Sequence, residues 1–200
     1  MAVKKKTTTR KRPAQNDPAA KILDAALDWA AESGWRSLKM TDIAEATGFN
    51  LGQIHAVYPC KASILNGLVR RIDEQVLNDG DADGDGIRDR LFDLLMRRFD
   101  ALNNIKPAIK SMASDSLFDP IAALVSGPRM LSSMYWMLDA AGVNVSGLLG
   151  LVRCQGLLII YANGFRVWLK DDSEDMSPTM AALDHGLRQA ERLESCRRGR

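Results

Sequence analysis

Two short helix-forming segments separated by a glycine constrain the fold of this 200-residue chain more than any other feature. The first segment follows Thr41, a residue type that caps helices, and Gly48 interrupts it. Asn50 starts the second, with Gln53 three residues later as its capping-box partner. Pro59 ends it, because proline disfavours helical geometry in the preceding residue. The pattern predicts a helix-turn-helix.

Three positions in this pattern have the residue types that two closely crossing helices need. Ala44 is small enough for close approach, Gly48 supplies the turn conformation, and Ile54 anchors the second helix in a core.

Helical periodicity continues along most of the chain, and we find no strand pattern and no internal repeat. Asp17 and Pro18 form a helix start signal, and Gly34 ends that first helix. Further helices are expected over residues 42–47, 50–58, 61–78, 87–103, 105–115, 119–140, 146–170 and 177–195. The sequence therefore predicts an all-α protein.

Composition and periodicity divide the chain into four parts. They are a basic arm over 1–16, expected to be disordered, a helix-turn-helix domain over 17–77, a Gly/Asp-rich linker over 78–86 and a helical domain over 87–196.

The net charge of +2 is too small to indicate a nucleic-acid partner by itself. Cations gather in the arm, where they are either solvated or supply non-specific phosphate affinity. Hydrophobic residues make up 46% of the chain, which is typical of a globular protein. Three cysteines, Cys60, Cys154 and Cys196, show neither paired nor metal-ligand spacing. We expect a cytoplasmic protein, because no apolar segment follows the basic N-terminus as in a signal peptide.

The linker opens like a calcium-binding loop, with Asp79, Asp81, Asp83 and Gly84 in the pattern D-x-D-x-D-G. Such a loop needs a glutamate at its twelfth position, where this chain has Arg90. A cation there repels calcium, so we interpret the loop as a solvated hinge.

No catalytic set is visible, because neither His55 nor His185 lies near a serine or cysteine motif. Four further acids, predicted to lie in a solvated turn, are Asp171, Asp172, Glu174 and Asp175. We therefore expect no enzyme, no metal and no cofactor.

The helix near 147–168 is apolar on almost every side and must be covered on more than one face. Gly156, Ile160 and Gly164 form a smooth ridge for a neighbouring helix. With Leu183 and Leu187 of the last helix, this ridge predicts a homodimer interface of four helices, although core packing explains some of the same residues.

A cluster of methionine and aromatic residues over 130–137 has two interpretations. Methionine adapts to irregular apolar shapes and suits a pocket for a hydrophobic molecule. Periodicity alone favours ordinary core packing.

Residues 40–61 read MTDIAEATGFNLGQIHAVYPCK and, within the stretch from Ala19 to Leu68, resemble the DNA-binding domain of the TetR family. The resemblance implies a TetR-like fold whose second short helix enters the major groove. It also implies DNA contacts by Thr41, Asn50, Gln53, His55 and Lys61, with Asn50 and Gln53 as readers of adenine and Lys61 on a phosphate. Ala56 and Val57 add no polar contact, so a scaffold that no longer reads DNA is the alternative.

Four stretches between residues 90 and 176 resemble the accessory proteins of ubiquinone biosynthesis, which keep the TetR fold, bind isoprenoid lipid and assist a partner hydroxylase. The stretches read RLFD (90–93), MRRFDAL (96–102), SMYWMLDAAG (133–142) and VWLKDDSEDM (167–176). This resemblance implies a lipid pocket lined by Met130, Met134, Trp136, Met137 and Trp168.

Two functional hypotheses follow. The first is a homodimeric regulator that binds a palindromic operator in double-stranded DNA and senses a hydrophobic effector through its C-terminal pocket. The alternative is a lipid-binding accessory protein of ubiquinone biosynthesis that acts with a partner enzyme and has lost DNA binding.

Overall fold

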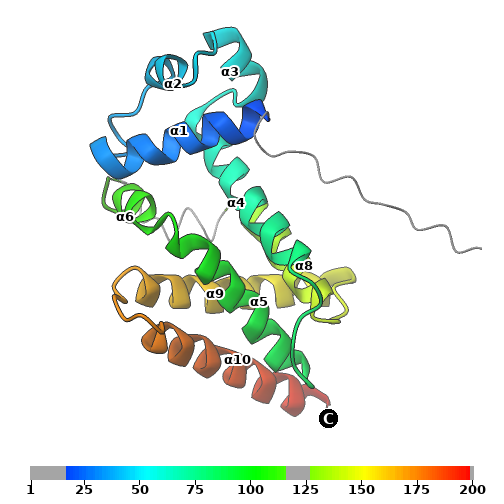
Figure 1. Ribbon diagram of the computed structural model, residues 1–200. Helices are drawn as coiled ribbons and strands as arrows, with labels where there is room; N and C mark the ends of the chain where they lie inside the picture. Colours follow the sequence, from blue (N-terminus) through cyan, green and yellow to red (C-terminus); the bar gives the residue numbers. More distant parts are fainter. Residues whose placement is uncertain (1–16, 116–126, 199–200) are drawn as a thin grey trace, which may run out of the picture.

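The computed structural model describes residues 17–115 and 127–198, which form helices joined by loops and contain no strand (Figure 1). The predicted all-α fold is confirmed. The predicted basic arm over 1–16, and the part of the predicted helix 119–140 that precedes residue 127, lie outside the described residues. The helices are α1 (Pro18–Ser33), α2 (Met40–Thr47), α3 (Leu51–Val57), α4 (Lys61–Asn78), α5 (Ile87–Asn103), α6 (Lys106–Asp115), α8 (Pro128–Ala140), α9 (Gly147–Trp168) and α10 (Ser177–Arg198).

Local capping sets the boundaries of the first three helices. Asp17 accepts a hydrogen bond from the backbone N–H of Ala19 at 3.0 Å, as expected for the cap of α1. Helix α2 begins two residues before the predicted position. Its N-cap is Lys39, whose N–H donates to the Asp42 carboxylate at 2.8 Å, so Thr41 is not the cap. Gly48 ends α2 with φ 74°, a left-handed conformation that glycine adopts without strain.

Helices α1, α2 and α3 form one end of the molecule, and α4 runs from them into the remaining helices (Figure 1). Tyr58, directly after α3, is buried and donates from its hydroxyl to the carbonyl of Ala19 at 3.3 Å. Gly67 of α4 leaves room for that ring, because a Cβ there would lie 2.5 Å from the Tyr58 hydroxyl oxygen. These contacts fix α3 relative to α1 and α4.

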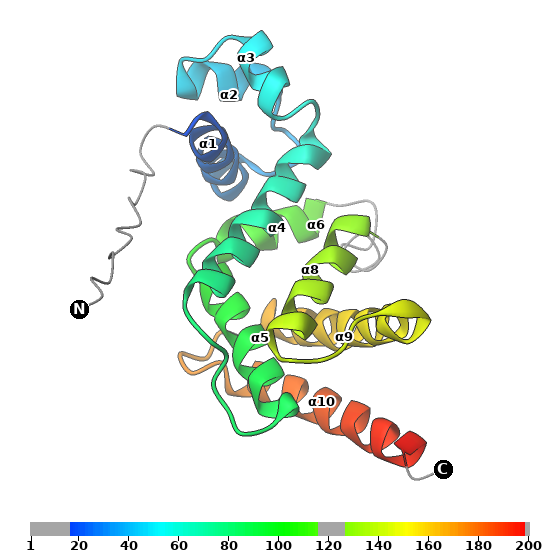
Figure 2. The ribbon, with the colours of Figure 1, turned by 90° about the vertical axis from the view of Figure 1, so that its right-hand side faces the viewer.

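Helix α6 lies between α1 and the C-terminal helices and packs against α1 (Figure 2). The backbone N–H of Trp35, in the loop after α1, donates to the Ser111 hydroxyl of α6 at 3.2 Å. The two halves of the protein are therefore connected both through α4 and through α6.

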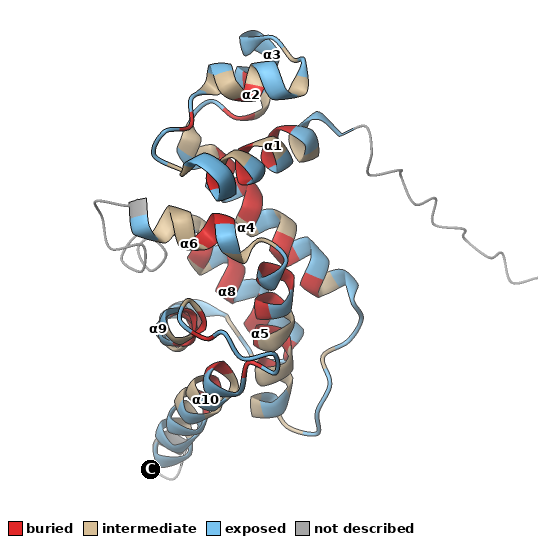
Figure 3. Ribbon diagram, turned by 60° about the vertical axis from the view of Figure 1, so that its left-hand side comes forward, coloured by how far each residue is buried: buried red, intermediate tan, exposed pale blue. Residues whose placement is uncertain are grey.

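Helices α9 and α10 lie side by side at the end of the molecule opposite α3, with their buried residues facing the neighbouring helices (Figure 3). Two glycines bring them together. A Cβ on Gly164 of α9 would lie 2.8 Å from Leu183, and one on Gly186 of α10 would lie 2.9 Å from Ile160. Close packing here thus occurs within one chain.

Among the described residues, α9 alone has the length and apolar composition of a helix that could cross a membrane. In its most apolar stretch, 44% of the residues are buried inside the protein.

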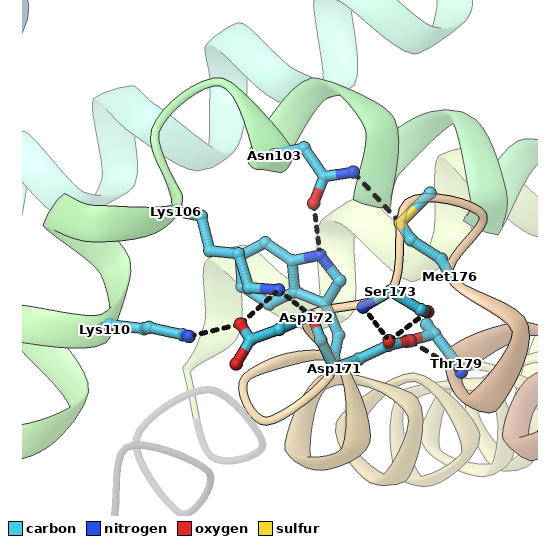
Figure 4. A network of polar contacts seen from close by, with 9 residues as sticks. Asn103, Lys106, Lys110, Asp171, Asp172, Ser173, Met176 and Thr179 are labelled. Carbon is cyan, nitrogen blue, oxygen red and sulfur yellow. Dashed lines mark hydrogen bonds and ion pairs between the residues drawn. The ribbon is translucent and has the colours of Figure 1, made fainter.

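A polar network joins the loop between α9 and α10 to α5 and α6 (Figure 4). Trp168 donates from Nε1 to Asn103 at 2.7 Å, the Lys106 ammonium bonds the carbonyl of Asp171 and lies over the Trp168 ring, and Lys110 donates to Asp172 at 2.8 Å. The network holds the start of α6 against the C-terminal helices.

Asp171 in this network corrects the prediction of a solvated turn, because it is buried and is bonded by Ser173 and Thr179. Both hydroxyls donate to its carboxylate at 2.5 Å, and both backbone N–H groups donate at 3.1 Å. Spacing along the chain places the four acids in one loop but does not show that one of them turns inward to meet the start of α10.

These bonds make the stability of the protein dependent on pH. Burial opposes ionisation of Asp171, but the hydrogen bonds from Ser173 and Thr179 outweigh it and lower its pKa to about 2. Because the folded pKa lies below the ordinary value, ionised Asp171 stabilises the fold above about pH 4, and this contribution is lost as the pH falls toward about 2.

We expect the wild type to exceed Asp171→Asn in free energy of unfolding by about 2 kcal/mol near neutral pH. The gap should close between about pH 4 and about pH 2, where the carboxylate of the folded protein takes up its proton. Urea unfolding followed by circular dichroism across that range measures both proteins. A gap that stays constant with pH would contradict the assignment.

Candidate functional site

Helix α3 presents one face to solvent and buries only Ile54 fully. Gln53 and His55 are exposed on it, and Leu51 exposes 50% of its surface. An exposed helix held by a buried anchor on a helix-turn-helix has the shape that enters a DNA major groove.

Asn50 and Gln53 form a reciprocal capping box at the start of α3. The Gln53 backbone N–H donates to Asn50 Oδ1 at 2.9 Å, and the Asn50 N–H donates to Gln53 Oε1 at 2.9 Å. Bidentate recognition of adenine uses the side-chain oxygen as well as the nitrogen. In the structure both oxygens are bonded to the backbone, so the side-chain NH₂ groups are what these residues present to a ligand.

Of the other three residues predicted to contact DNA, two are exposed and the third is bonded to backbone carbonyls of the protein. Thr41 is exposed in the first turn of α2, and His55 is exposed on α3. The Lys61 ammonium instead donates to the carbonyls of Trp35 and Leu38, at 2.6 and 3.0 Å, and lies 4.9 Å from the centre of the Trp35 ring. It ties the start of α4 to the loop between α1 and α2, and its phosphate contact stays a prediction.

The five residues predicted to line a pocket do not lie together. Met130, Met134 and Met137 share the buried face of α8, whereas Trp136 points away from them and exposes 49% of its surface. Trp168 is fully buried near the end of α9 beside Phe99 and Phe165. Trp136 is therefore separated from the three methionines of its own helix, because one step along a helix turns a side chain by roughly 100°.

An apolar groove of about 480 Å³ runs between the start of α5, α9 and α10, and none of those five residues lines it. Leu149, Val152 and Gly156 of α9 face it, together with Leu193 of α10. Leu148 and Ile159 of α9 do not line the groove but are also exposed, with 79% and 64% of their surfaces in contact with solvent.

Of the five residues predicted to form the dimer interface, one is exposed, one is half-buried and three are buried. Gly156 is exposed, and Ile160 is half-buried at the groove. Gly164, Leu183 and Leu187 are buried, and Gly164 meets Leu183 between α9 and α10 of one chain, whereas Leu187 also lines the groove. The sequence pattern predicts a close helix approach but does not distinguish an internal neighbour from a second copy.

Sequence reasoning missed a buried ion pair that joins three helices. Asp73 of α4 and Arg98 of α5 form it, and their side chains expose only 5% and 2% of their surfaces. Ser133 of α8 donates to Asp73 at 2.5 Å and accepts from Arg98 at 2.8 Å. A signal exists in the sequence, because Asp73 and Arg98 each fall on the core-facing stripe of an amphipathic helix.

The aspartate-rich loop after α4 is held by an arginine. Arg97 donates to the carbonyls of Gly80 and Asp81, at 3.2 and 3.1 Å, and pairs with Asp93 at 2.8 Å. Within residues 17–115 and 127–198, no three histidine, cysteine, aspartate or glutamate side chains are placed to hold a metal ion.

Solved structures with the same arrangement of helices exist. A TetR transcriptional regulator from Nitrosomonas europaea ATCC 19718 is 24% identical, with a TM-score of 0.64, and the match covers 88% of this chain and 99% of that one. A TetR transcriptional regulator from Rhodococcus sp. RHA1 is 18% identical, with a TM-score of 0.63 and coverages of 84% and 92%. No protein-family model and no curated protein sequence matches the chain. The chain therefore has the fold of TetR-type regulators, as the sequence predicted.

Proposed function

We propose that this protein is a DNA-binding transcriptional regulator that acts as a homodimer in the cytoplasm and responds to a hydrophobic effector. The exposed face of α3, held rigidly on a helix-turn-helix, is the observation that carries the proposal. The TetR-type fold supports it, because the similar structures are described as transcriptional regulators.

The polar groups of this face suit direct contact with DNA. The side-chain NH₂ groups of Asn50 and Gln53 and the His55 ring can meet base-edge acceptors or phosphates while the capping box stays intact. Two copies of α3, about 34 Å apart in successive major grooves, would read the halves of a palindrome.

The exposed apolar face of α9 supports the dimer. Leu148, Leu151, Val152 and Ile159 recur at helical spacing on that side, and Leu193 of α10 exposes 74% of its surface. Monomeric proteins seldom leave such a continuous apolar face in water. A second copy with its own α9 and α10 would cover it as a four-helix bundle.

Gln53→Glu tests DNA binding without removing the cap. Glutamate keeps an acceptor for the Asn50 N–H and suits the start of a helix, but it removes the NH₂ donor and adds a negative charge. We expect about tenfold or greater loss of affinity for the protein's own upstream DNA. Fluorescence anisotropy over a salt series, with a scrambled duplex for comparison, measures the change.

Gln75→Glu is the matched control, because it makes the same charge change at an exposed position near the far end of α4. It should leave DNA affinity unchanged. If Gln53→Glu binds like the wild type, α3 does not read DNA. Wild-type binding that ignores sequence and vanishes with salt would also overturn the regulator and favour the lipid-binding accessory role.

A further inference from the structure

The exposed face of α3 contains one large apolar side chain that the fold does not bury. Leu51 exposes 50% of its surface, and within residues 17–60, all of which the structure describes, no other large hydrophobic side chain is exposed. Ile54, at 1% exposure, already anchors α3 in the core. Leu51 is therefore not needed to pack α3 and is open to a partner of this face.

The rest of this face carries no lysine, arginine or carboxylate. Gly52, Gln53, His55 and Ala56 are exposed with Leu51, and no residue of α3 is an acid, a lysine or an arginine. Lysine and arginine neutralise DNA phosphates, whereas base edges are read by hydrogen bonds and apolar contacts. The composition of the face therefore suits base edges better than phosphates.

The two amide side chains at the start of this face present donors. Asn50 Oδ1 accepts from the Gln53 N–H, and Gln53 Oε1 accepts from the Asn50 N–H, so the NH₂ groups are left for DNA. In the major groove, thymine offers both an acceptor, O4, and an apolar C5-methyl group. Cytosine offers no acceptor there, and adenine and guanine offer no methyl group. Thymine is therefore the base whose edge matches both an NH₂ donor and the Leu51 side chain.

We propose that Leu51 determines sequence specificity by packing against the C5-methyl group of a thymine in each half of the operator. This reading of thymine rests on the proposed function and deepens it, because it names a base that α3 selects. Gly52 and Ala56 are too small to keep Leu51 from a base edge. A Cβ at position 52 would also lie 3.2 Å from Asn50 Oδ1, so the glycine leaves room for the capping box.

Deoxyuridine measures the contact, because it keeps the O4 atom and the base pairing of thymine but lacks the methyl group. Burial of one methyl group corresponds to about a fourfold change in affinity. A dimer that contacts one thymine in each half-site should therefore bind about 15-fold more weakly when deoxyuridine replaces thymine.

The probe is the duplex that the full chain enriches from a random-sequence DNA library, prepared once with thymine and once with deoxyuridine. Fluorescence anisotropy at one fixed salt concentration measures both affinities. We expect a thymine at the same position in each half-site and the loss given above. An enriched duplex without a shared thymine, or equal affinities for the two preparations, would overturn the role of Leu51.

Leu51→Ser separates this contact from the effect of the methyl groups on the DNA itself. The variant should bind the thymine and deoxyuridine duplexes about equally, because little apolar surface remains at position 51. Leu65→Ser is the matched control, since Leu65 is exposed on α4, at 37%, and it should keep the full preference for thymine. A preference that survives in Leu51→Ser, or one that disappears in both variants, would reject the contact.

Failure of this role and failure of the proposed function give different results. If the wild type enriches a duplex but binds its thymine and deoxyuridine forms equally, the protein reads DNA sequence without Leu51 contacting a thymine methyl group. If it enriches no duplex, α3 does not read sequence, and both the role of Leu51 and the regulator are overturned.

Discussion

Arg98→Ala is expected to lower the free energy of unfolding by about 3–5 kcal/mol, the largest effect of any single substitution considered for this protein. The variant leaves the Asp73 carboxylate buried between α4, α5 and α8 without its nearest cation. Arg129, at 3.5 Å and partly exposed, compensates only in part. Urea unfolding followed by circular dichroism at neutral pH measures the loss.

Arg70→Ala is the comparison for Arg98→Ala. Arg70 also forms an ion pair, with Glu74 at 3.8 Å, but its side chain exposes 55% of its surface. Water screens such a pair, so the loss should stay below about 1 kcal/mol. The double variant Asp73→Leu/Arg98→Met should recover most of the stability, because no charge remains buried. A loss for Arg98→Ala as small as that for Arg70→Ala would contradict the assigned role of the buried pair.

Leu151→Glu combined with Ile159→Glu is expected to convert the proposed dimer into a monomer. Both side chains are exposed on α9, at 47% and 64%, so the substitutions leave the interior of the protomer unchanged. In a dimer, four carboxylates would be forced into an apolar contact, where burying an unpaired charge is strongly unfavourable. Analytical ultracentrifugation should show the mass falling from that of two chains to that of one.

The same variant should also lose most of its affinity for a palindromic operator, because a monomer places only one α3 on DNA. Leu65→Glu serves as the control, since Leu65 is exposed on α4, at 37%, and does not line the groove beside α9. It should remain a dimer. A wild type that sediments as a monomer would contradict the proposed dimer, and a double variant that stays a dimer would show that the interface lies on another surface.

The helix-turn-helix and most helix boundaries, with the start of α2 as an exception, follow from the sequence because their signals are local. Asp17 caps α1, Gly48 ends α2 in a left-handed conformation, and Asn50 with Gln53 caps α3 through groups only three residues apart. Such bonds form within one turn of a helix and do not depend on the rest of the chain. The TetR-like fold itself was predicted from the resemblance over residues 40–61.

The roles of individual side chains depend on contacts between residues far apart in the sequence, and these the tertiary structure alone decides. Asp73 and Arg98 are separated by 25 positions, and Lys110 and Asp172 by 62. Asp171 is buried and Trp136 exposed, against the sequence prediction for both, because burial is set by which helix covers a residue. Helical spacing shows which side chains share a face, and only the packed arrangement shows whether that face meets another helix or water.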